Sequence, residues 1–193
     1  MANEGISKIR KALLLFLLGY IINFIVAIFG TGSLLSPGGA QRVASGGMAI
    51  ELVNIIGAFG LLVAFFWIRG GFKKLSEKKP KLKIGSIGAL LELIGLGITI
   101  IANVVLAVEL LTAPQSAASP SLMIGAVAVA TFVISFFGLI IYIIGDILCT
   151  IAFWRVGSEN KSSLIKAGAV FYFLFPLVGG PLLYKGLEEV EEK

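Results

Sequence analysis

Two carboxylates stand inside long apolar runs of this chain and are its clearest candidates for chemistry. Glu92 lies in the run GALLELIGLGITI, and Asp146 lies in the run IIYIIGDILCTI. Ionisable side chains inside apolar helices are costly and therefore mark candidate functional sites. We expect Glu92 and Asp146 to form an intramembrane polar site. Lys166 could pair with either carboxyl there, and Tyr142, one helical turn from Asp146, could donate a hydrogen bond.

Two roles are open for these carboxylates. They form either a protonatable pair coupled to the movement of ions or solutes, or a structural clamp that bonds Lys166, Tyr142 or backbone groups. Glu92 also belongs to a stripe of small residues at spacings of three and four, which share one helix face. Small residues let helices approach closely, so we expect this face to pack against another helix. The stripe comprises Gly85, Gly88, Glu92, Gly95, Thr99 and Ala102.

Other chemistry has little support in the sequence. A second charged group, expected at the outer face, consists of Arg42, Glu51 and Glu109. The chain has no histidine, which is the commonest general base and a frequent metal ligand. Its single cysteine, Cys149, lies in an apolar run and is interpreted as a small buried hydrophobe. No phosphate-binding loop, zinc-ligand spacing or nucleophile elbow occurs. The sequence therefore predicts a protein that is not an enzyme and has no metal and no cofactor.

The candidate site must be positioned by long apolar helices. Hydrophobic residues make up 58% of the 193 residues, charged residues make up 14%, and the mean hydropathy is +1.00. Soluble domains are typically about 45–50% apolar and about 25% charged. A helix that crosses a membrane needs roughly 20 apolar residues. We expect one all-α integral membrane domain over 1–193, with about five transmembrane helices. The predicted spans are 12–30, 48–68, 84–111, 121–154 and 164–184.

Three of these spans carry irregular features. The fourth would be about 51 Å long as a single helix, so we expect tilt, a kink or an extramembrane turn. The fifth contains Pro176 and Pro181, which remove backbone donors, so we expect a kink or a break there. The first could be a signal peptide, but its apolar run is long for one, so we expect it to be retained.

Basic residues alternate between the segments that join the spans. Lys8, Arg10 and Lys11 precede the first span, seven basic residues fill 69–83, and the connection after the third span has none. The positive-inside rule therefore places the N-terminus and the 69–83 loop on the cytoplasmic side of the cell membrane. With five spans, it places the C-terminus on the extracellular side. The net charge of +5 then predicts contact with membrane lipids rather than nucleic acid. The predicted headgroup contacts are Arg69, Lys73, Lys74, Lys78, Lys79, Lys81 and Lys83.

The second and fourth spans share landmarks near their inner ends. The letters IIG recur at 55–57 and 143–145, and AF recurs at 64–65 and 152–153. A second shared pattern follows each basic loop, KIGSI at 83–87 and KAGAV at 166–170. These matches predict one leading helix followed by two similar helical hairpins, related by an axis along the membrane normal.

Three sets of short patterns stand out along 55–187. They are RGGFKKL at 69–75 with IGSIG at 84–88, IGDIL at 144–148 with AFWRVG at 152–157, and the end of the chain from KAG at 166–168 to GL at 186–187. Together they resemble an archaeal, crenarchaeal-type family of polytopic membrane proteins of unknown function, and the resemblance covers 55–187. It implies a membrane protein and carries over no catalytic residue.

We therefore expect a non-enzymatic membrane scaffold or accessory subunit that self-associates or joins a larger membrane complex. The alternative is a small ion- or proton-coupled transporter or channel, in which Glu92 and Asp146 form the coupling site. The surroundings of the two carboxyls distinguish these roles. A water-filled cavity that reaches them favours transport, whereas carboxyls sealed between glycine faces and paired with Lys166 favour a clamp.

Overall fold

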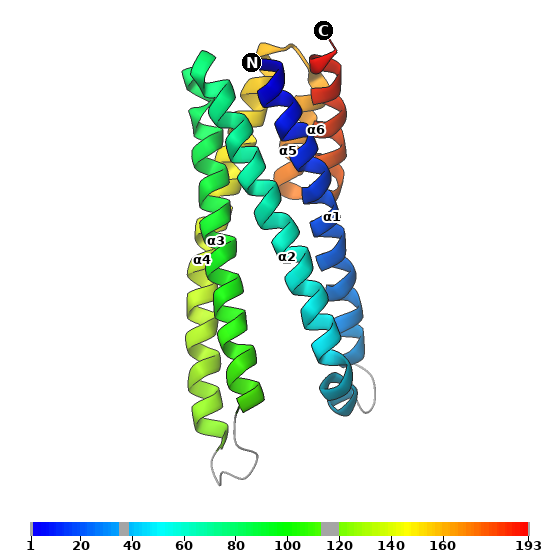
Figure 1. Ribbon diagram of the computed structural model, residues 1–193, viewed down its shortest axis with the longest axis vertical. Helices are drawn as coiled ribbons and strands as arrows, with labels where there is room; N and C mark the ends of the chain where they lie inside the picture. Colours follow the sequence, from blue (N-terminus) through cyan, green and yellow to red (C-terminus); the bar gives the residue numbers. More distant parts are fainter. Residues whose placement is uncertain (1, 35–38, 113–119, 193) are drawn as a thin grey trace.

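Helices account for nearly all of the chain in the computed structural model, which describes residues 2–34, 39–112 and 120–192. Side chains are described at 4–25, 53, 56–105, 108 and 129–192. The predicted all-α class is confirmed (Figure 1). In chain order the elements are α1 (Ala2–Leu34), α2 (Gly39–Lys78), a short 3-10 turn η1 (Pro80–Leu82), α3 (Lys83–Thr112), α4 (Pro120–Glu159), α5 (Ser163–Leu174) and α6 (Pro176–Glu191).

Three segments with described side chains are long and apolar enough to cross a membrane. They are Ile56–Lys78, Pro80–Val105 and Val129–Glu159. Each of the first four predicted spans falls inside one of the helices α1 to α4. Large apolar side chains along these helices point outward, among them Ile101 at 67% and Phe132 at 71% exposure. This pattern is compatible with helices that face lipid.

The four long helices form two antiparallel pairs, α1 with α2 and α3 with α4 (Figure 1). The pairs converge at the end that holds both chain termini and the η1 turn, which we call the basic end (Figure 1). They diverge toward the opposite end. Among the described side chains, the buried hydrophobic core lies in the halves of these helices nearer the basic end, for example at Phe16, Phe65, Ala89 and Phe153. The helices α5 and α6 complete the core there.

The predicted fifth span, 164–184, is not one helix. α5 ends at Leu174 and α6 begins at Pro176, so the chain turns back on itself (Figure 1). Phe175 lies between the two helices with φ −145° and ψ 81°, because a residue before proline is disfavoured in the helical region. The predicted second hairpin therefore differs from the first, since α5 has only 12 residues.

Glycines allow α5 and α6 to pack as a short hairpin. A Cβ atom at Gly179 would lie 2.0 Å from the backbone nitrogen of Tyr172. A Cβ at Gly168 would lie 2.7 Å from the nitrogen of Leu183, and one at Gly186 would lie 2.6 Å from the side chain of Ile165. Because no side chain fits at these separations, the close approach of the two helices depends on glycine.

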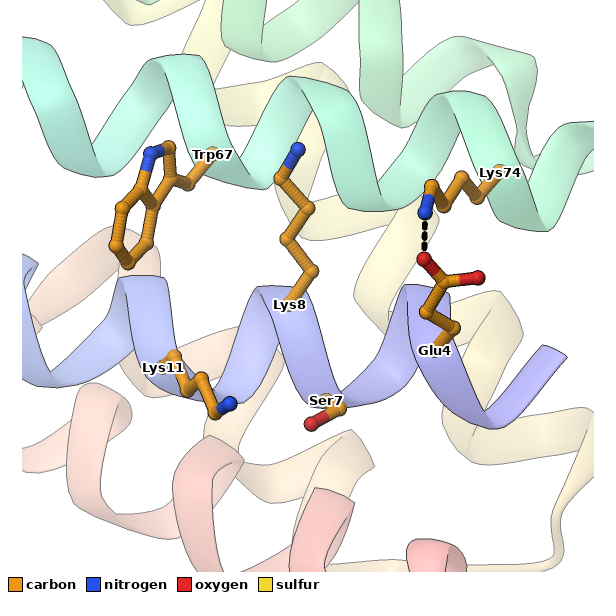
Figure 2. Close-up of a pocket in the computed structure, with 6 residues that line it drawn as sticks. All are labelled: Glu4, Ser7, Lys8, Lys11, Trp67 and Lys74. Carbon is orange, nitrogen blue, oxygen red and sulfur yellow. Dashed lines mark hydrogen bonds and ion pairs between the residues drawn. The ribbon is translucent and has the colours of Figure 1, made fainter. Parts of the chain in front are cut away.

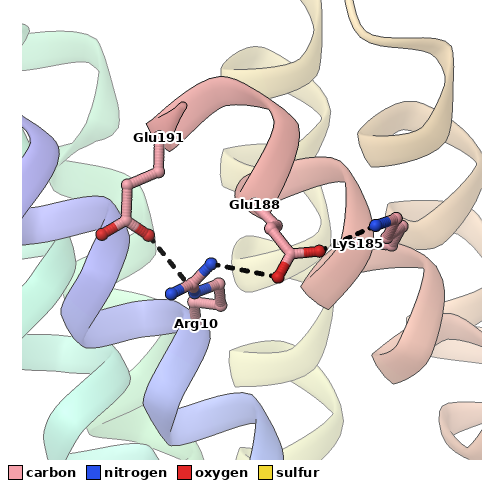
Figure 3. Close-up of polar contacts among 4 residues, drawn as sticks. All are labelled: Arg10, Lys185, Glu188 and Glu191. Carbon is pink, nitrogen blue, oxygen red and sulfur yellow. Dashed lines mark hydrogen bonds and ion pairs between the residues drawn. The ribbon is translucent and has the colours of Figure 1, made fainter. Parts of the chain in front are cut away.

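The break in the fifth span changes the position of the C-terminus. The predicted arrangement put the two termini on opposite sides, whereas they lie at the same end of the bundle (Figure 1). Figure 3 shows the contact that joins them: Arg10 of α1 lies between two glutamates of α6. Its Nη1 is 3.4 Å from Glu188, and its Nε is 3.2 Å from Glu191. The two ends of the chain therefore lie together, because α6 returns to the basic end, and the side of the membrane on which the C-terminus lies stays a prediction.

The predicted basic loop 69–83 is mostly helical. α2 continues through Lys78, so only Lys79 and η1 separate it from α3. Contacts from α4 hold this turn in place. Arg155 donates a 2.7 Å hydrogen bond to the carbonyl of Lys81, and Lys79 pairs with Glu159 at 2.6 Å. The prediction of a 15-residue loop missed the helix because polarity, rather than helix propensity, set its boundary.

Candidate functional site

Glu92 lies at the interface of α3 and α4, where glycines bring the two backbones together. A Cβ at Gly145 would lie 2.6 Å from the nitrogen of Glu92, and a Cβ at Gly88 would lie 2.7 Å from the carbonyl oxygen of Gly145. One turn further along, a Cβ at Gly95 would lie 2.5 Å from the carbonyl oxygen of Gly138. The expected packing of the small-residue stripe against another helix is confirmed.

The side chain of Glu92 is completely buried in this interface. Its Oε2 lies 3.5 Å from the Sγ of Cys149 on α4, which also lies 3.6 Å from the carbonyl oxygen of Gly85. A thiol has one hydrogen, and it is a weak donor that these two acceptors share. The other oxygen, Oε1, is buried with no hydrogen-bond partner in the described part of the chain. Glu92 is thus a sealed and poorly compensated carboxyl.

The second carboxyl, Asp146, lies on α4 next to this site and is 9% exposed. Tyr142, one turn before it, packs its ring against Phe65 with centroids 5.9 Å apart. Tyr172 of α5 completes the surroundings. Its ring packs between those of Phe16 and Phe153, tilted against the first and edge-on to the second, at centroid distances of 5.1 and 5.5 Å.

Tyr142 and Asp146 flank Gly145 on α4, where a Cβ would lie 2.6 Å from the backbone nitrogen of Glu92. The hydroxyl of Tyr172 is buried without a hydrogen-bond partner among the described residues. The structure therefore brings together the predicted Glu92, Asp146 and Tyr142.

Lys166 does not join the site, so its predicted pairing with the carboxyls is wrong. Its Nζ lies 5.7 Å from the centroid of the Trp154 ring, in a cation–π contact, and its stem passes Gly157. Lys166 follows the α4–α5 turn at the basic end, whereas Asp146 lies 13 residues before the end of α4. This separation is about 20 Å along a helix. No lysine or arginine among the described residues forms an ion pair with either carboxyl.

The remaining predicted residues lie apart from this site. Arg42, Glu51 and Glu109 fall outside the described side chains, and their grouping stays a prediction. The predicted headgroup-contacting side chains lie at the basic end, where the exposed ones include Lys73, Lys78, Lys81 and Lys83. Two others are used within the protein, since Lys74 pairs with Glu4 and Lys79 pairs with Glu159.

Two residues of the site, Cys149 and Tyr172, were not predicted from the sequence. Cys149 was interpreted as a plain apolar residue, although its spacing of three from Asp146 places both on one face of α4. Tyr172 gave no signal, because its approach to Glu92 depends on the turn between α4 and α5, which folds α5 back against α4. The described residues contain no group of three acidic or cysteine side chains that could hold a metal ion. Since no described lysine or arginine pairs with Glu92 or Asp146, proton binding and release is one chemistry open to the site.

Comparison with known proteins places the chain in a family. A family model described as "Protein of unknown function (DUF973)" matches residues 3–193, so the chain belongs to that family. No curated protein and no solved structure matches the chain. The expected membership of a family of unknown function is confirmed, while the archaeal origin that the resemblance implied stays a prediction.

Proposed function

We propose that this member of the DUF973 family is a non-enzymatic integral membrane protein that acts as a scaffold or accessory subunit and self-associates in the bilayer. The observation that carries this proposal is the uneven packing of the bundle. The core joins all six helices at the basic end, whereas the helix pairs α1–α2 and α3–α4 diverge beyond it (Figure 1).

The diverging halves expose apolar side chains that a monomer does not cover. Val129 is 65% exposed, Phe132 is 71% exposed, and Phe59 on the other helix pair is 62% exposed. Lipid can solvate such side chains, but two separated helix pairs also offer surfaces on which helices of another copy can pack through van der Waals contacts. A scaffold needs such surfaces, and it needs no catalytic group.

Disulfide trapping tests self-association with a matched pair of positions on α4. Val129 and Ile147 are 18 residues apart, about five helical turns, so they lie on one helix face. Both are exposed, but Ile147 lies nearer the basic end. In oxidised liposomes, Val129→Cys should give covalent dimers, and Ile147→Cys should give few. Equal dimer yields at the two positions, or none at Val129→Cys, would contradict the proposal. The native Cys149 is buried and should form no disulfide-linked dimers.

The proposal also places both termini and the η1 turn in the cytoplasm, since the basic residues gather at that end. Four long helices would then cross the membrane, and the α5–α6 hairpin would enter and leave on the same side. Cysteines at the exposed positions Glu189 and Lys81 should be labelled by an impermeant maleimide from one and the same side. Labelling from opposite sides would overturn this topology.

A second candidate function is proton-coupled transport through the bundle. The buried, unpartnered Oε1 of Glu92 favours it, because an uncompensated intramembrane carboxyl is costly for a purely structural role. The pairing with Lys166 that would have favoured a clamp is not made. The broken helix beside the carboxyl is also a feature of transporter binding sites, where interrupted helices surround the substrate.

Flux measurements in proteoliposomes test this second function. Under a proton gradient, Glu92→Gln and Asp146→Asn should each reduce proton flux at least about tenfold, because neither amide can carry a proton. The exposed Glu77 provides the matched control, since Glu77→Gln removes a carboxylate outside the site and should leave flux unchanged. Wild-type flux no higher than that of empty liposomes would exclude proton transport and leave the scaffold role.

A further inference from the structure

A groove at the basic end lies between the beginning of α1 and the end of α2. It is open to the surroundings and has a volume of about 420 Å³, which is within the common size range of ligand sites. Figure 2 shows Lys8 of α1 extending toward α2 and Lys74 of α2 extending toward Glu4, while Ser7 and Lys11 lie along the other side of α1 in this view. The lining residues are Glu4, Ser7, Lys8, Lys11, Trp67 and Lys74. The groove is separate from the buried carboxyls, and its lysines on α1 lie outside the segment predicted to contact headgroups.

The charges in the groove leave two cations available. Glu4 pairs with Lys74, and the hydrogen bond and charge of that ammonium hold the pKa of Glu4 below its usual value of 4.5. Glu4 is therefore ionised at neutral pH, and it is satisfied by Lys74. Lys8 reaches across to α2, where a Cβ at Gly70 would lie 2.7 Å from its Nζ. Among the described residues, neither Lys8 nor Lys11 forms an ion pair.

The groove lies where the polar surface of the basic end meets the apolar surface of α1 and α2. Trp67 lies at the edge of the groove farther from the basic end, and its side chain is 37% exposed. Tryptophan is enriched at membrane interfaces. One turn further from the basic end, the surface becomes apolar, with Leu14 and Leu18 on α1 and Val63 on α2 all exposed. An anionic group in the groove could thus continue into a hydrocarbon chain along α1 and α2.

We propose that this groove binds the phosphate group of an anionic phospholipid, with Lys8 and Lys11 as cationic contacts, Ser7 as a hydroxyl donor, and Trp67 at the glycerol level. The lysines supply charge and hydrogen bonds, and the exposed apolar surface holds the acyl chains. The site requires membrane insertion but neither self-association nor proton transport. A result that contradicts the lipid site would therefore leave the proposed scaffold and transport functions untouched, and the reverse also holds.

Lipid retention tests the site. The full-length protein is extracted from bilayers of phosphatidylcholine with a minor fraction of phosphatidylglycerol, and native mass spectrometry counts the lipids that remain bound. Each basic residue near an anionic membrane surface contributes about a fivefold factor. Lys8→Gln with Lys11→Gln should therefore lower the retention of phosphatidylglycerol about 10- to 30-fold. Lys8→Arg with Lys11→Arg should retain it.

The matched control removes the same charge outside the groove. Lys161 and Lys185 are exposed at the same end and are not among the predicted headgroup contacts, so Lys161→Gln with Lys185→Gln should change retention less than about twofold. Equal losses in the two double variants would overturn the proposal, because only general surface charge would then matter. If the groove double variant does not fold, Lys11→Gln alone should still lower retention about fivefold, since Lys11 is exposed.

A second arm distinguishes a lipid from a free phosphate. In phosphatidylglycerol bilayers, millimolar inorganic phosphate should not displace the retained lipid, because the acyl chains contribute to its binding. In pure phosphatidylcholine bilayers, the same phosphate should leave the fluorescence of Trp67, measured in a Trp154→Phe background, unchanged. Displacement of the lipid, or a saturable fluorescence change that Lys11→Gln abolishes, would show a soluble phosphate site and overturn the lipid assignment.

Discussion

The α3–α4 pair and the α5–α6 hairpin are both packed through glycines but differ in length and in what they enclose. The long pair approaches at Gly88, Gly95 and Gly145, and it holds the carboxyl of Glu92 between its backbones. The short hairpin approaches even more closely, at Gly179, and buries mainly apolar groups such as Leu183. Close helix packing at glycines thus surrounds a polar site in one region and an apolar core in the other.

The difference comes from what interrupts each helix. α3 and α4 contain no proline within their described interiors, so they run the length of the bundle. α5 stops before Pro176, and its last turn carries Tyr172 to the carboxyl site from a third direction. The short hairpin therefore closes the site that the long pair carries. Changes in the two regions should have separable effects.

The largest effect is expected for Gly179→Ala in the hairpin. The new Cβ would lie 2.0 Å from the nitrogen of Tyr172 and 2.4 Å from the carbonyl carbon of Phe171, and backbone atoms cannot move aside locally. We expect a loss of about 3 kcal/mol in the free energy of unfolding, measured by thermal or denaturant unfolding in mild detergent. Gly97 is the control, because a Cβ there meets nothing within 4 Å. Gly97→Ala should gain about 0.5–1 kcal/mol. Similar losses in both variants would disprove this account.

A smaller loss is expected for Gly145→Ala in the long pair. Its Cβ would lie 2.6 Å from the nitrogen of Glu92 and should separate α3 from α4 at a cost of about 2 kcal/mol. The separation should also expose Cys149, which is fully buried in the wild type. Maleimide labelling of Cys149 should therefore become at least several-fold faster. Gly60→Ala serves as the control, since its Cβ makes an ordinary 3.7 Å contact. Unchanged labelling in Gly145→Ala would contradict the proposed packing.

Replacement of the two prolines should have opposite signs. Pro176→Ala removes the constraint that keeps Phe175 out of the helical region, and we expect it to cost about 1 kcal/mol by allowing α5 and α6 to join. Pro181 lies inside α6 and is exposed, so Pro181→Ala should be neutral or stabilising. Unfolding midpoints of both variants measure the difference. A stabilised Pro176→Ala protein would show that glycine packing alone sets the turn.

The smallest effect is expected from acid at the contact between α6 and α1. Lys185, 2.9 Å from Glu188, and then Arg10 hold the pKa of Glu188 below its usual value of 4.5 (Figure 3). A lowered folded-state pKa adds stability above the unfolded pKa, and this contribution is lost as pH falls through the folded value. The unfolding midpoint should therefore drop slightly below about pH 4.5, by less than in Pro176→Ala. Glu188→Gln should remove this part of the pH dependence.

Helix class, the first four helical segments and the packing of the small-residue face were predictable from residue patterns. Apolar runs and spacings of three and four are local properties, so a short stretch of sequence is enough to detect them. The same locality explains the errors. Lys166 was assigned to the carboxyls from span depth alone, but the turn before α5 holds it over Trp154. Cys149 was undervalued because its partner is 57 residues away in the chain.

By itself, the sequence determined that this is a helical, membrane-compatible chain with two acidic residues in apolar surroundings and a proline in its last apolar segment. Only the tertiary structure decided that Glu92 is sealed without a cationic partner, that Tyr172 approaches it, and that the C-terminus returns to Arg10. The physical reason is that a proline specifies a break but not the angle that follows it. That angle is set by glycine contacts between α5 and α6, which exist only once the helices have met.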